Sequence, residues 1–305
     1  MKRMKPITDR DVVLDALTLC YEVETTYHYE ELKRIKIDEY YELYDFKLKR
    51  INGRYFKNVY TIIFYDSDTD KYKSFGHLKF NLNEENDEKN NLHVNGKPKV
   101  WITLENSILY SDELYYISYI DSELGLSPHN ITTIDLAFDT NFDMAKKIKS
   151  WIKCRDLCIV LNGKIIRDRD RDIPEITYTT SGSCNKTEKY KTVNIKQKKA
   201  IHDKTKGTTA ICYNKLAEIR NSSGKDYILA HYGNPNRLYR VEVHLNYEQI
   251  KDFFLGQENE WFRFYGFLQK DLREELFFEH LNRLIYFKYG KHNITWQYLL
   301  GKNAA

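Results

Sequence analysis

The chain reads ITTIDLAFD over residues 131–139, and the fold class follows from the pattern of this stretch. Successive side chains of a β-strand point to opposite faces, so the apolar residues at even positions between 134 and 138 share one face. The other face carries Asp135 and Asp139 on either side of the small residue Ala137. The pattern predicts a strand that buries one face in a core and presents two carboxylates on the other.

Strand patterns surround this stretch on both sides. Residues 43–51 and 55–65 flank Asn52-Gly53 and predict a β-hairpin, because Asn-Gly favours positive φ at both turn positions. Further strands are predicted at 73–82, 100–104, 157–166, 176–180, 208–213 and 238–245. Helices are predicted at 9–34, 111–124, 142–152 and 269–288. We therefore predict an α+β fold with a mainly antiparallel central sheet, flanking helices and a helical C-terminus.

The chain has 305 residues, with 48 Lys and Arg against 44 Asp and Glu and a formal net charge of +4. At roughly 100–200 residues per domain, this length predicts about two domains or one large one. We expect three regions. They are an N-terminal α+β region with hairpins at 1–130, a central core at 131–255 and a helical region at 256–305.

Composition excludes several classes of protein. No run approaches the roughly 18 apolar residues that a membrane-spanning helix needs, and no signal-peptide core follows the charged N-terminus. The five cysteines are odd in number and scattered, which indicates a reducing cytosol rather than a disulfide-stabilised scaffold. We expect a cytoplasmic protein that has no membrane partner.

Positive charge is concentrated in one segment. The basic strip, residues 186–225, holds eleven Lys and Arg against three Asp and Glu. One interpretation is a solvated loop, which is the usual fate of a charge run. The other is a surface that binds the phosphates of a nucleic acid, because Lys and Arg contacts supply most of the sequence-independent affinity.

Several catalytic motifs are missing from the sequence. It contains no Walker-type phosphate loop, no dinucleotide-binding glycine motif and no nucleophile elbow. The nine histidines form no His-x-His pair and no His-Glu-x-x-His helix, so histidine-based metal chemistry is not expected. Cys154 and Cys158 lack a second pair of ligands at zinc spacing.

A second strand pattern, RVEVHL at residues 240–245, places its three polar side chains on one face. With Asp135 and Asp139, Glu242 would supply the oxygen ligands that Mg²⁺ or Mn²⁺ prefers. The alternative is that both aspartates face solvent while Glu242 pairs with Arg240. The alternation of the strands does not choose between these two arrangements.

The third candidate lies at residues 210–218, which read AICYNKLAE. A strand enters this segment and a helical pattern leaves it, with Tyr213 at the junction and Lys215 close by. Tyrosine forms covalent intermediates in enzymes once it is activated, and a positive field favours that. The alternative is a packing or surface role, since the chain has 25 tyrosines.

Three short motifs follow one another along the chain: IDLAFD at 134–139, ICYNK at 211–215 with Glu218, and RVEV at 240–243. In order and spacing, this set resembles the Rep_trans (replication initiation factor) family of rolling-circle plasmid replication initiators and related conjugative relaxases. The resemblance covers residues 131–250. It implies a sheet of the nicking-domain type and makes residues 131–255 the catalytic nicking core.

The resemblance also implies a reaction. Tyr213 would attack a phosphodiester at an origin and form a 5′-phosphotyrosine, leaving a free 3′-hydroxyl. Asp135 and Glu242, with Asp139, would hold Mg²⁺ or Mn²⁺, which would act as a Lewis acid on the phosphate.

Basic residues would contact the DNA in this scheme. Lys215 and Arg240 would neutralise charge on the non-bridging oxygens of the phosphate. The strand would be held by five lysines of the basic strip: Lys196, Lys198, Lys199, Lys204 and Lys206.

The resemblance implies origin DNA, single-stranded or locally melted, as the substrate, and a homodimer and a host helicase as partners. Residues 256–305 would contribute to origin recognition, and a plasmid, phage or other mobile element of a bacterial host would encode the chain. Two other functions stay open. A non-catalytic DNA-binding protein would need neither Asp135 nor Tyr213, and a metal-dependent nuclease that uses water would need only the carboxylates.

Overall fold

The computed structural model describes residues 11–66, 69–82, 97–166, 173–181, 190–197, 207–255 and 264–302. The fold is α+β, as predicted, with a large antiparallel sheet and a second, smaller sheet. Within the described ranges, no helix is long and apolar enough to cross a membrane.

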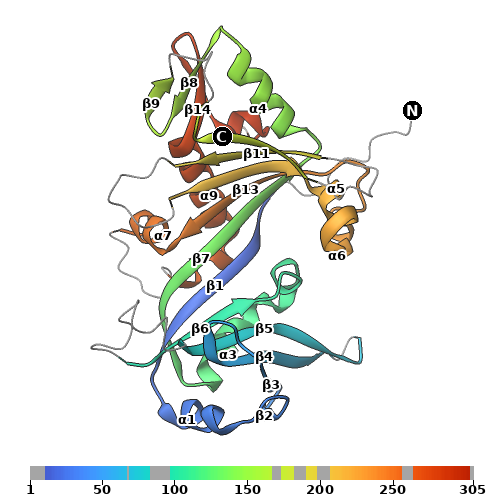
Figure 1. The fold of residues 1–305 in the computed structure, drawn as a ribbon, viewed down its shortest axis with the longest axis vertical. Helices are drawn as coiled ribbons and strands as arrows, with labels where there is room; N and C mark the ends of the chain where they lie inside the picture. The colour runs from blue at the N-terminus through green and yellow to red at the C-terminus, as the bar shows by residue number, and fades with distance from the viewer. Residues whose placement is uncertain are drawn as a thin grey trace. The chain divides into compact units, whose positions relative to one another are not determined.

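Eleven described strands form the large sheet, in the order β10-β11-β12-β13-β7-β1-β6-β5-β4-β3-β2 (Figure 1). Their bounds are β1 (Val12–Val23), β2 (Tyr40–Leu43), β3 (Phe46–Ile51), β4 (Phe56–Asp66), β5 (Lys71–Leu82), β6 (Lys99–Leu104), β7 (Leu126–Thr140), β10 (Ile176–Ser181), β11 (Tyr190–Lys196), β12 (Thr209–Asn214) and β13 (Tyr239–Asn246). The small sheet has the order β15-β14-β8-β9, with β8 (Leu157–Leu161), β9 (Lys164–Ile166), β14 (Ile285–Tyr289) and β15 (His292–Ile294).

The helices are α1 (Thr26–Arg34), α3 (Ile117–Glu123), α4 (Met144–Lys153), α5 (Lys215–Glu218), α6 (Asp226–His231), α7 (Tyr247–Phe253), α9 (Lys270–Leu284) and α10 (Trp296–Leu299). Short helical turns of other types lie at Ile108–Tyr110, Asp112–Tyr116, Ile219–Ser223 and Gly266–Leu268.

The chain divides into two compact units. The first unit consists of Met1–Leu14, Asp135–Gly256 and Gly266–Ala305, and the second of Asp15–Ile134 and Gln257–Tyr265. This division differs from the three regions predicted from the sequence, because the C-terminal part from Gly266 onward belongs to the same unit as residues 135–255. Helix α9 provides the reason, since it packs against β12 and β13.

The first predicted helix is wrong over most of its length. Residues 12–23 form strand β1, and only α1 within the predicted range 9–34 is helical. The residues that decide the outcome are Leu17, Leu19, Tyr21 and Val23, which alternate and are all buried. Their period of two fits a strand inside a sheet. The helix-like spacing of apolar residues in this segment, on which the prediction of a helix rested, did not determine the structure.

Two hairpins show different turn chemistry. β3 and β4 pair as predicted, from Phe46↔Phe64 to Ile51↔Val59, but the connection is longer than two residues and Asn52 and Gly53 do not adopt positive φ. The predicted strand 157–166 is itself a hairpin: Leu161 pairs with Lys164, and Asn162 and Gly163 have φ of 50° and 74°. Positive φ at both turn residues is the hairpin geometry that Asn-Gly favours.

The C-terminal part is less helical than predicted. α9 ends at Leu284, short of the predicted residue 288, and the chain continues directly as β14. The strand is fixed there because Ile285 pairs with Leu161, and the buried indole of Trp296 donates a hydrogen bond of 2.8 Å to the Ile285 carbonyl. The helical pattern continued past the end of the helix because Ile285 and Phe287 are also buried, in the small sheet.

In the second unit, the segment that returns to it late in the chain is anchored by aromatic and polar contacts. The rings of Phe264 and Tyr21 pack edge to face, with centroids 5.0 Å apart. The buried hydroxyl of Tyr265 donates a hydrogen bond to Asp121. Burial raises the pKa of the Asp121 carboxyl to about 6, while its hydrogen bond from Tyr265 opposes that rise.

The backbone of β6 approaches Gly76 of β5 closely, and a substitution at this glycine tests that packing. The register of β4 and β5 shifts at Ile62/Ile63, and a Cβ at Gly76 would lie 2.5 Å from the Thr103 carbonyl oxygen of β6. Because backbone cannot move aside cheaply, we expect Gly76→Ala to lower the free energy of unfolding by about 1–3 kcal/mol. Urea unfolding monitored by circular dichroism measures this.

Ser74 on the same strand provides a matched control. Its hydroxyl is buried and has no hydrogen-bond partner among the described residues. Ser74→Ala removes that unsatisfied group, so it should leave stability unchanged or raise it slightly. Equal losses for the two variants would contradict the close approach of β6 at Gly76.

Candidate active site

The pairing of β12 with β13 sets the geometry of the site. The strands are antiparallel, with Tyr213 opposite Arg240, Ile211 opposite Glu242 and Thr209 opposite His244. Directly paired residues project to the same face of a sheet. Tyr213 therefore shares a face with the three polar residues of β13, as the alternation of the sequence predicts.

A buried ion pair joins β13 to β7. The Arg240 guanidinium donates two hydrogen bonds to Asp139, of 2.9 Å from Nε to Oδ1 and 2.6 Å from Nη2 to Oδ2, and both side chains are 0% exposed. This bidentate contact corrects two predictions. Arg240 is not presented to a phosphate and Asp139 is not presented to a metal ion, because each is enclosed with the other as its partner.

A second pair joins the same two strands nearer the surface. His244 Nδ1 lies 2.5 Å from Asp135 Oδ1, and the two side chains are 35% and 22% exposed. The two contacts are four residues apart on both strands, which run antiparallel. Ala137, midway between Asp135 and Asp139, therefore lies across from Glu242, midway between Arg240 and His244. Asp135, Ala137 and Asp139 thus share the face of Glu242, and Ala137 is fully buried there.

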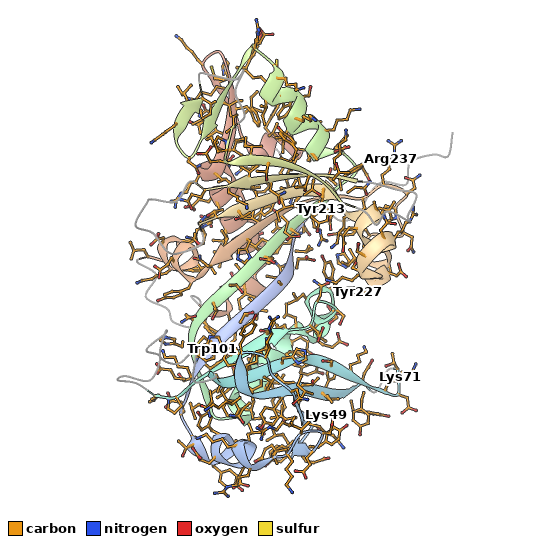
Figure 2. All side chains as sticks on the ribbon, in the orientation of Figure 1. Lys49, Lys71, Trp101, Tyr213, Tyr227 and Arg237 are labelled. Carbon is orange, nitrogen blue, oxygen red and sulfur yellow. The ribbon has the colours of Figure 1, made fainter. Side chains whose placement is uncertain are left out.

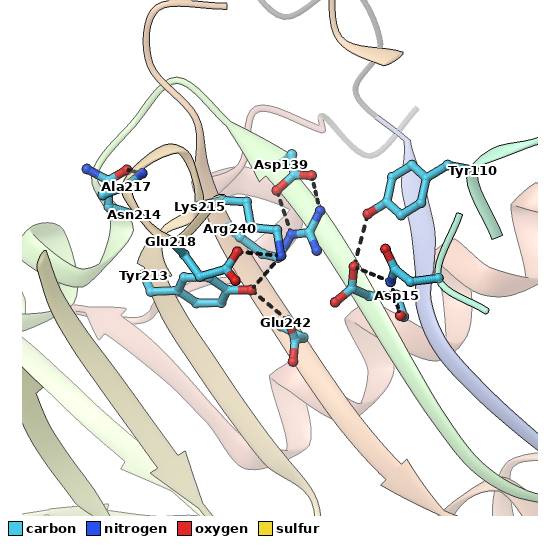
Figure 3. Close-up of polar contacts among 11 residues, drawn as sticks. Asp15, Tyr110, Asp139, Tyr213, Asn214, Lys215, Ala217, Glu218, Arg240 and Glu242 are labelled. Atoms are coloured by element: carbon cyan, nitrogen blue, oxygen red, sulfur yellow. Dashed lines mark hydrogen bonds and ion pairs between the residues drawn. The ribbon is translucent and has the colours of Figure 1, made fainter. Parts of the chain in front are cut away.

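The centre of the site is the hydroxyl of Tyr213 (Figure 3). It donates a hydrogen bond of 3.0 Å to Glu242 Oε2, and it accepts one of 3.4 Å from Lys215 Nζ. Lys215 also forms an ion pair of 3.0 Å with Glu218. Arg240, the residue that the alternative arrangement pairs with Glu242, is bound through Nε and Nη2 by Asp139.

A change from strand to helix holds these groups together. Tyr213 lies near the end of β12 (Figure 2), and Asn214 caps α5 by accepting a 3.0 Å hydrogen bond from the Ala217 amide. The helix buries Lys215 to 2% exposure and directs its ammonium back toward the tyrosine. Glu218, one helical turn later, reaches the same ammonium.

This arrangement is suited to nucleophilic chemistry. A phenol is a weak nucleophile until a base accepts its proton, and Glu242 lies within hydrogen-bond reach of that proton. The Lys215 ammonium favours negative charge on the phenolic oxygen and on any phosphate oxygen beside it. The Tyr213 side chain is half-buried, so its hydroxyl is held by the fold while part of the ring remains accessible.

The predicted metal ligands do not assemble as a set. Asp139 is enclosed with Arg240, Asp135 contacts His244, and Glu242 accepts a hydrogen bond from the Tyr213 hydroxyl. Over the described ranges, no group of three or more His, Cys, Asp or Glu residues is placed to hold a metal ion. The residues present therefore do not fit the predicted three-carboxylate site, and a need for Mg²⁺ or Mn²⁺ stays a prediction.

The structure describes residues 190–197 and 207–225 of the basic strip. Lys196 ends β11 with an exposed side chain. The other predicted DNA contacts, Lys198, Lys199, Lys204 and Lys206, lie outside the described residues. The sequence interpretation also assigned no role to Glu218 or Asn214. The spacing of Lys215 and Glu218, three residues apart in a helical pattern, is the signal that indicates their ion pair.

Comparison with known proteins gives no family for the chain: no protein-family model matches it and no curated protein is significantly similar. The resemblance to replication initiators rests on the three motifs and stays a prediction.

The Asp139–Arg240 ion pair and the Asp135–His244 contact should contribute very differently to the free energy of unfolding. Asp139→Asn leaves the Arg240 guanidinium buried without its counter-charge, so we expect a loss of about 3–5 kcal/mol in the free energy of unfolding. Asp135→Asn removes a partly exposed pair and should change it by only about 0–1 kcal/mol. Chemical denaturation of both variants measures the difference. If Asp139→Asn stabilises the fold, the carboxylates are held together against their repulsion, as in an unfilled metal site, and the structural role is wrong.

Proposed function

We propose that this chain is a DNA nicking and closing enzyme of the rolling-circle type, with Tyr213 as its nucleophile. The observation that supports the proposal best is the Tyr213 hydroxyl, placed between the Glu242 carboxylate at 3.0 Å and the Lys215 ammonium at 3.4 Å. Base and cation thus meet at one phenolic oxygen. The order of the three sequence motifs supports the same function independently.

In the proposed reaction, the oxygen of Tyr213 forms a bond to the phosphorus of a DNA phosphodiester. Glu242 accepts the phenolic proton, and the bond from phosphorus to the 3′-oxygen breaks. The leaving 3′-oxygen takes a proton from water and becomes a 3′-hydroxyl, while the 5′-phosphate stays on Tyr213. Because one phosphate ester replaces another, the reverse attack by the 3′-hydroxyl rejoins the strand.

Lys215 acts on charge in this scheme. Its ammonium stabilises the phenolic oxygen as the proton leaves, and it stabilises the phosphate oxygens as negative charge develops on them. Burial at 2% exposure strengthens that effect, because few water molecules screen it. Glu218, 3.0 Å from the ammonium, holds the lysine in position.

The substrate of this enzyme would be single-stranded or locally melted DNA at a replication origin. We further propose that it acts as a homodimer in the cytoplasm of a bacterial host.

Tyr213→Phe tests the nucleophile. The variant loses one hydroxyl and keeps the ring, so the fold and DNA binding should survive while nicking and protein–DNA adducts fall to background. The assay is denaturing gel electrophoresis with an end-labelled oligonucleotide, run with Mn²⁺, with Mg²⁺ and with a chelator. Tyr178→Phe on β10 is the matched control, because it removes the same atom from a partly exposed tyrosine of the same sheet.

The outcome of this assay separates the alternatives. Cleavage by Tyr213→Phe that is lost in Glu242→Gln would identify water as the nucleophile and the chain as a metal-dependent nuclease. Binding without cleavage in the unmodified protein would indicate a non-catalytic DNA-binding protein. Activity that survives the chelator would contradict the predicted need for Mg²⁺ or Mn²⁺ and leave the tyrosine in place.

A salt titration tests the basic strip. If its lysines contact phosphates, the affinity for single-stranded DNA falls steeply with salt, and each lost contact reduces the slope of log K against log salt by about 0.7. Replacing Lys196, Lys198 and Lys199 with Ala should lower that slope by about 2, as fluorescence anisotropy would measure. Replacement of Lys146, Lys147 and Lys149 on α4 is the control of equal charge. An unchanged slope in the first variant would mean that these lysines do not contact phosphates.

A further inference from the structure

A pocket of about 720 Å³ opens in the second unit, and none of its lining residues belongs to the candidate active site. Its walls come from the β2–β3 turn, from β3, β4 and β5, and from the helical segment that begins at Ser111. Eight of its lining side chains are aromatic, six of these being tyrosines, and four are acidic against the single basic residue Lys47. Its chemistry is therefore aromatic and negative.

The rings form a buried floor and an exposed rim. Phe46 and Phe64 are 5% and 6% exposed and lie at the floor. On the rim, Tyr72 of β5 is 60% exposed and Tyr115 of the helical turn Asp112–Tyr116 is 58% exposed. Exposed aromatic rings gathered around one hollow indicate a binding surface, because a soluble fold normally covers such rings.

The acidic residues of the pocket differ in whether they are neutralised. Lys73 lies between Asp66 and Glu113, with contacts of 2.5 and 3.1 Å. Asp112, on the exposed rim, makes no ion pair or side-chain hydrogen bond with any described residue, and the same holds for Asp45. Two carboxylates are therefore left to attract a cation.

The pocket already holds one cation against a ring. The ammonium of Lys47 lies 5.3 Å from the centroid of Tyr72, while the same ammonium pairs with Glu42 at 3.0 Å. The negative face of an aromatic ring attracts a cation within about 6 Å. Phosphate would be repelled by the same carboxylates, so the pocket is unsuited to a nucleic-acid backbone.

We propose that this pocket binds an organic cation, with an alkylammonium group seated among the tyrosine rings and held by Asp45 and Asp112. The group can belong to a free polyamine or to a lysine side chain of a peptide, since both present the same ammonium on an apolar stem. This site is independent of the nicking reaction and does not require Tyr213.

Isothermal titration calorimetry on the full chain tests the proposal with spermidine and with a short lysine-containing peptide. Tyr115→Leu keeps apolar bulk but removes the ring, so it should weaken binding of the cation about two- to fivefold. Tyr289→Leu on β14 is the matched control, because Tyr289 is also 60% exposed but lies outside the pocket. Asp112→Asn should weaken binding and reduce its dependence on salt.

The two probes distinguish the source of the cation. Tighter binding of spermidine indicates a free polyamine, and tighter binding of the peptide indicates a protein segment. The proposal is overturned if neither probe binds, if neutral 1,8-octanediol binds equally well, or if Tyr115→Leu and Tyr289→Leu have the same effect. Binding of oligothymidylate that is lost in Tyr115→Leu, without binding of either cation, would show instead that the rings stack on bases.

Discussion

The ion pair between Arg240 and Asp139 is the constraint on which the first unit depends. Two charges removed from water are costly to bury, and only bidentate geometry with full hydrogen bonding offsets that cost. Arg240 also pairs across strands with Tyr213, so one buried guanidinium relates three neighbouring strands. A slip of one residue would turn Glu242 to the other face of the sheet and leave the guanidinium without its carboxylate. The register that satisfies the buried charge is the register that brings Glu242 to Tyr213.

The charged residues around Tyr213 are mostly paired with one another. Asp139 is neutralised by Arg240 and Asp135 is paired with His244, while Glu218 balances Lys215. With those charges paired, the tyrosine hydroxyl meets one carboxylate and one ammonium that the fold holds in place. Groups fixed before a reaction need little reorganisation when charge develops, which is the physical basis of electrostatic catalysis. The cap of Asn214 contributes by fixing where the strand stops and the helix begins.

The sequence predicted which side chains share a face of a strand, but not which side chains contact one another across strands. Alternation correctly placed the two aspartates of β7 on one face, and likewise the polar residues of β13, because a strand has a period of two whatever its neighbours are. It could not determine which carboxylate would meet Arg240, since that depends on strand order. The local sequence pattern did not predict the boundaries where two elements join. The buried residues of β14 continue the apolar pattern of α9, so the end of the helix was missed. The turn at Asn162-Gly163 lies within a segment that was predicted as one strand. Those boundaries are set by tertiary pairing rather than by propensity.

A tyrosine beside a carboxylate is not by itself a nucleophile, and the second unit shows why. Tyr265 also donates to a carboxylate, that of Asp121, but burial and that carboxylate both raise the pKa of the phenol, so the proton stays on the oxygen. At Tyr213 the hydroxyl faces the Lys215 ammonium as well, and its side chain is only half-buried. A carboxylate disfavours negative charge on the phenolic oxygen, and a nearby ammonium favours it. Among 25 tyrosines, composition cannot single out one. The proposal of Tyr213 as the nucleophile rests instead on the carboxylate and the ammonium that meet at its hydroxyl.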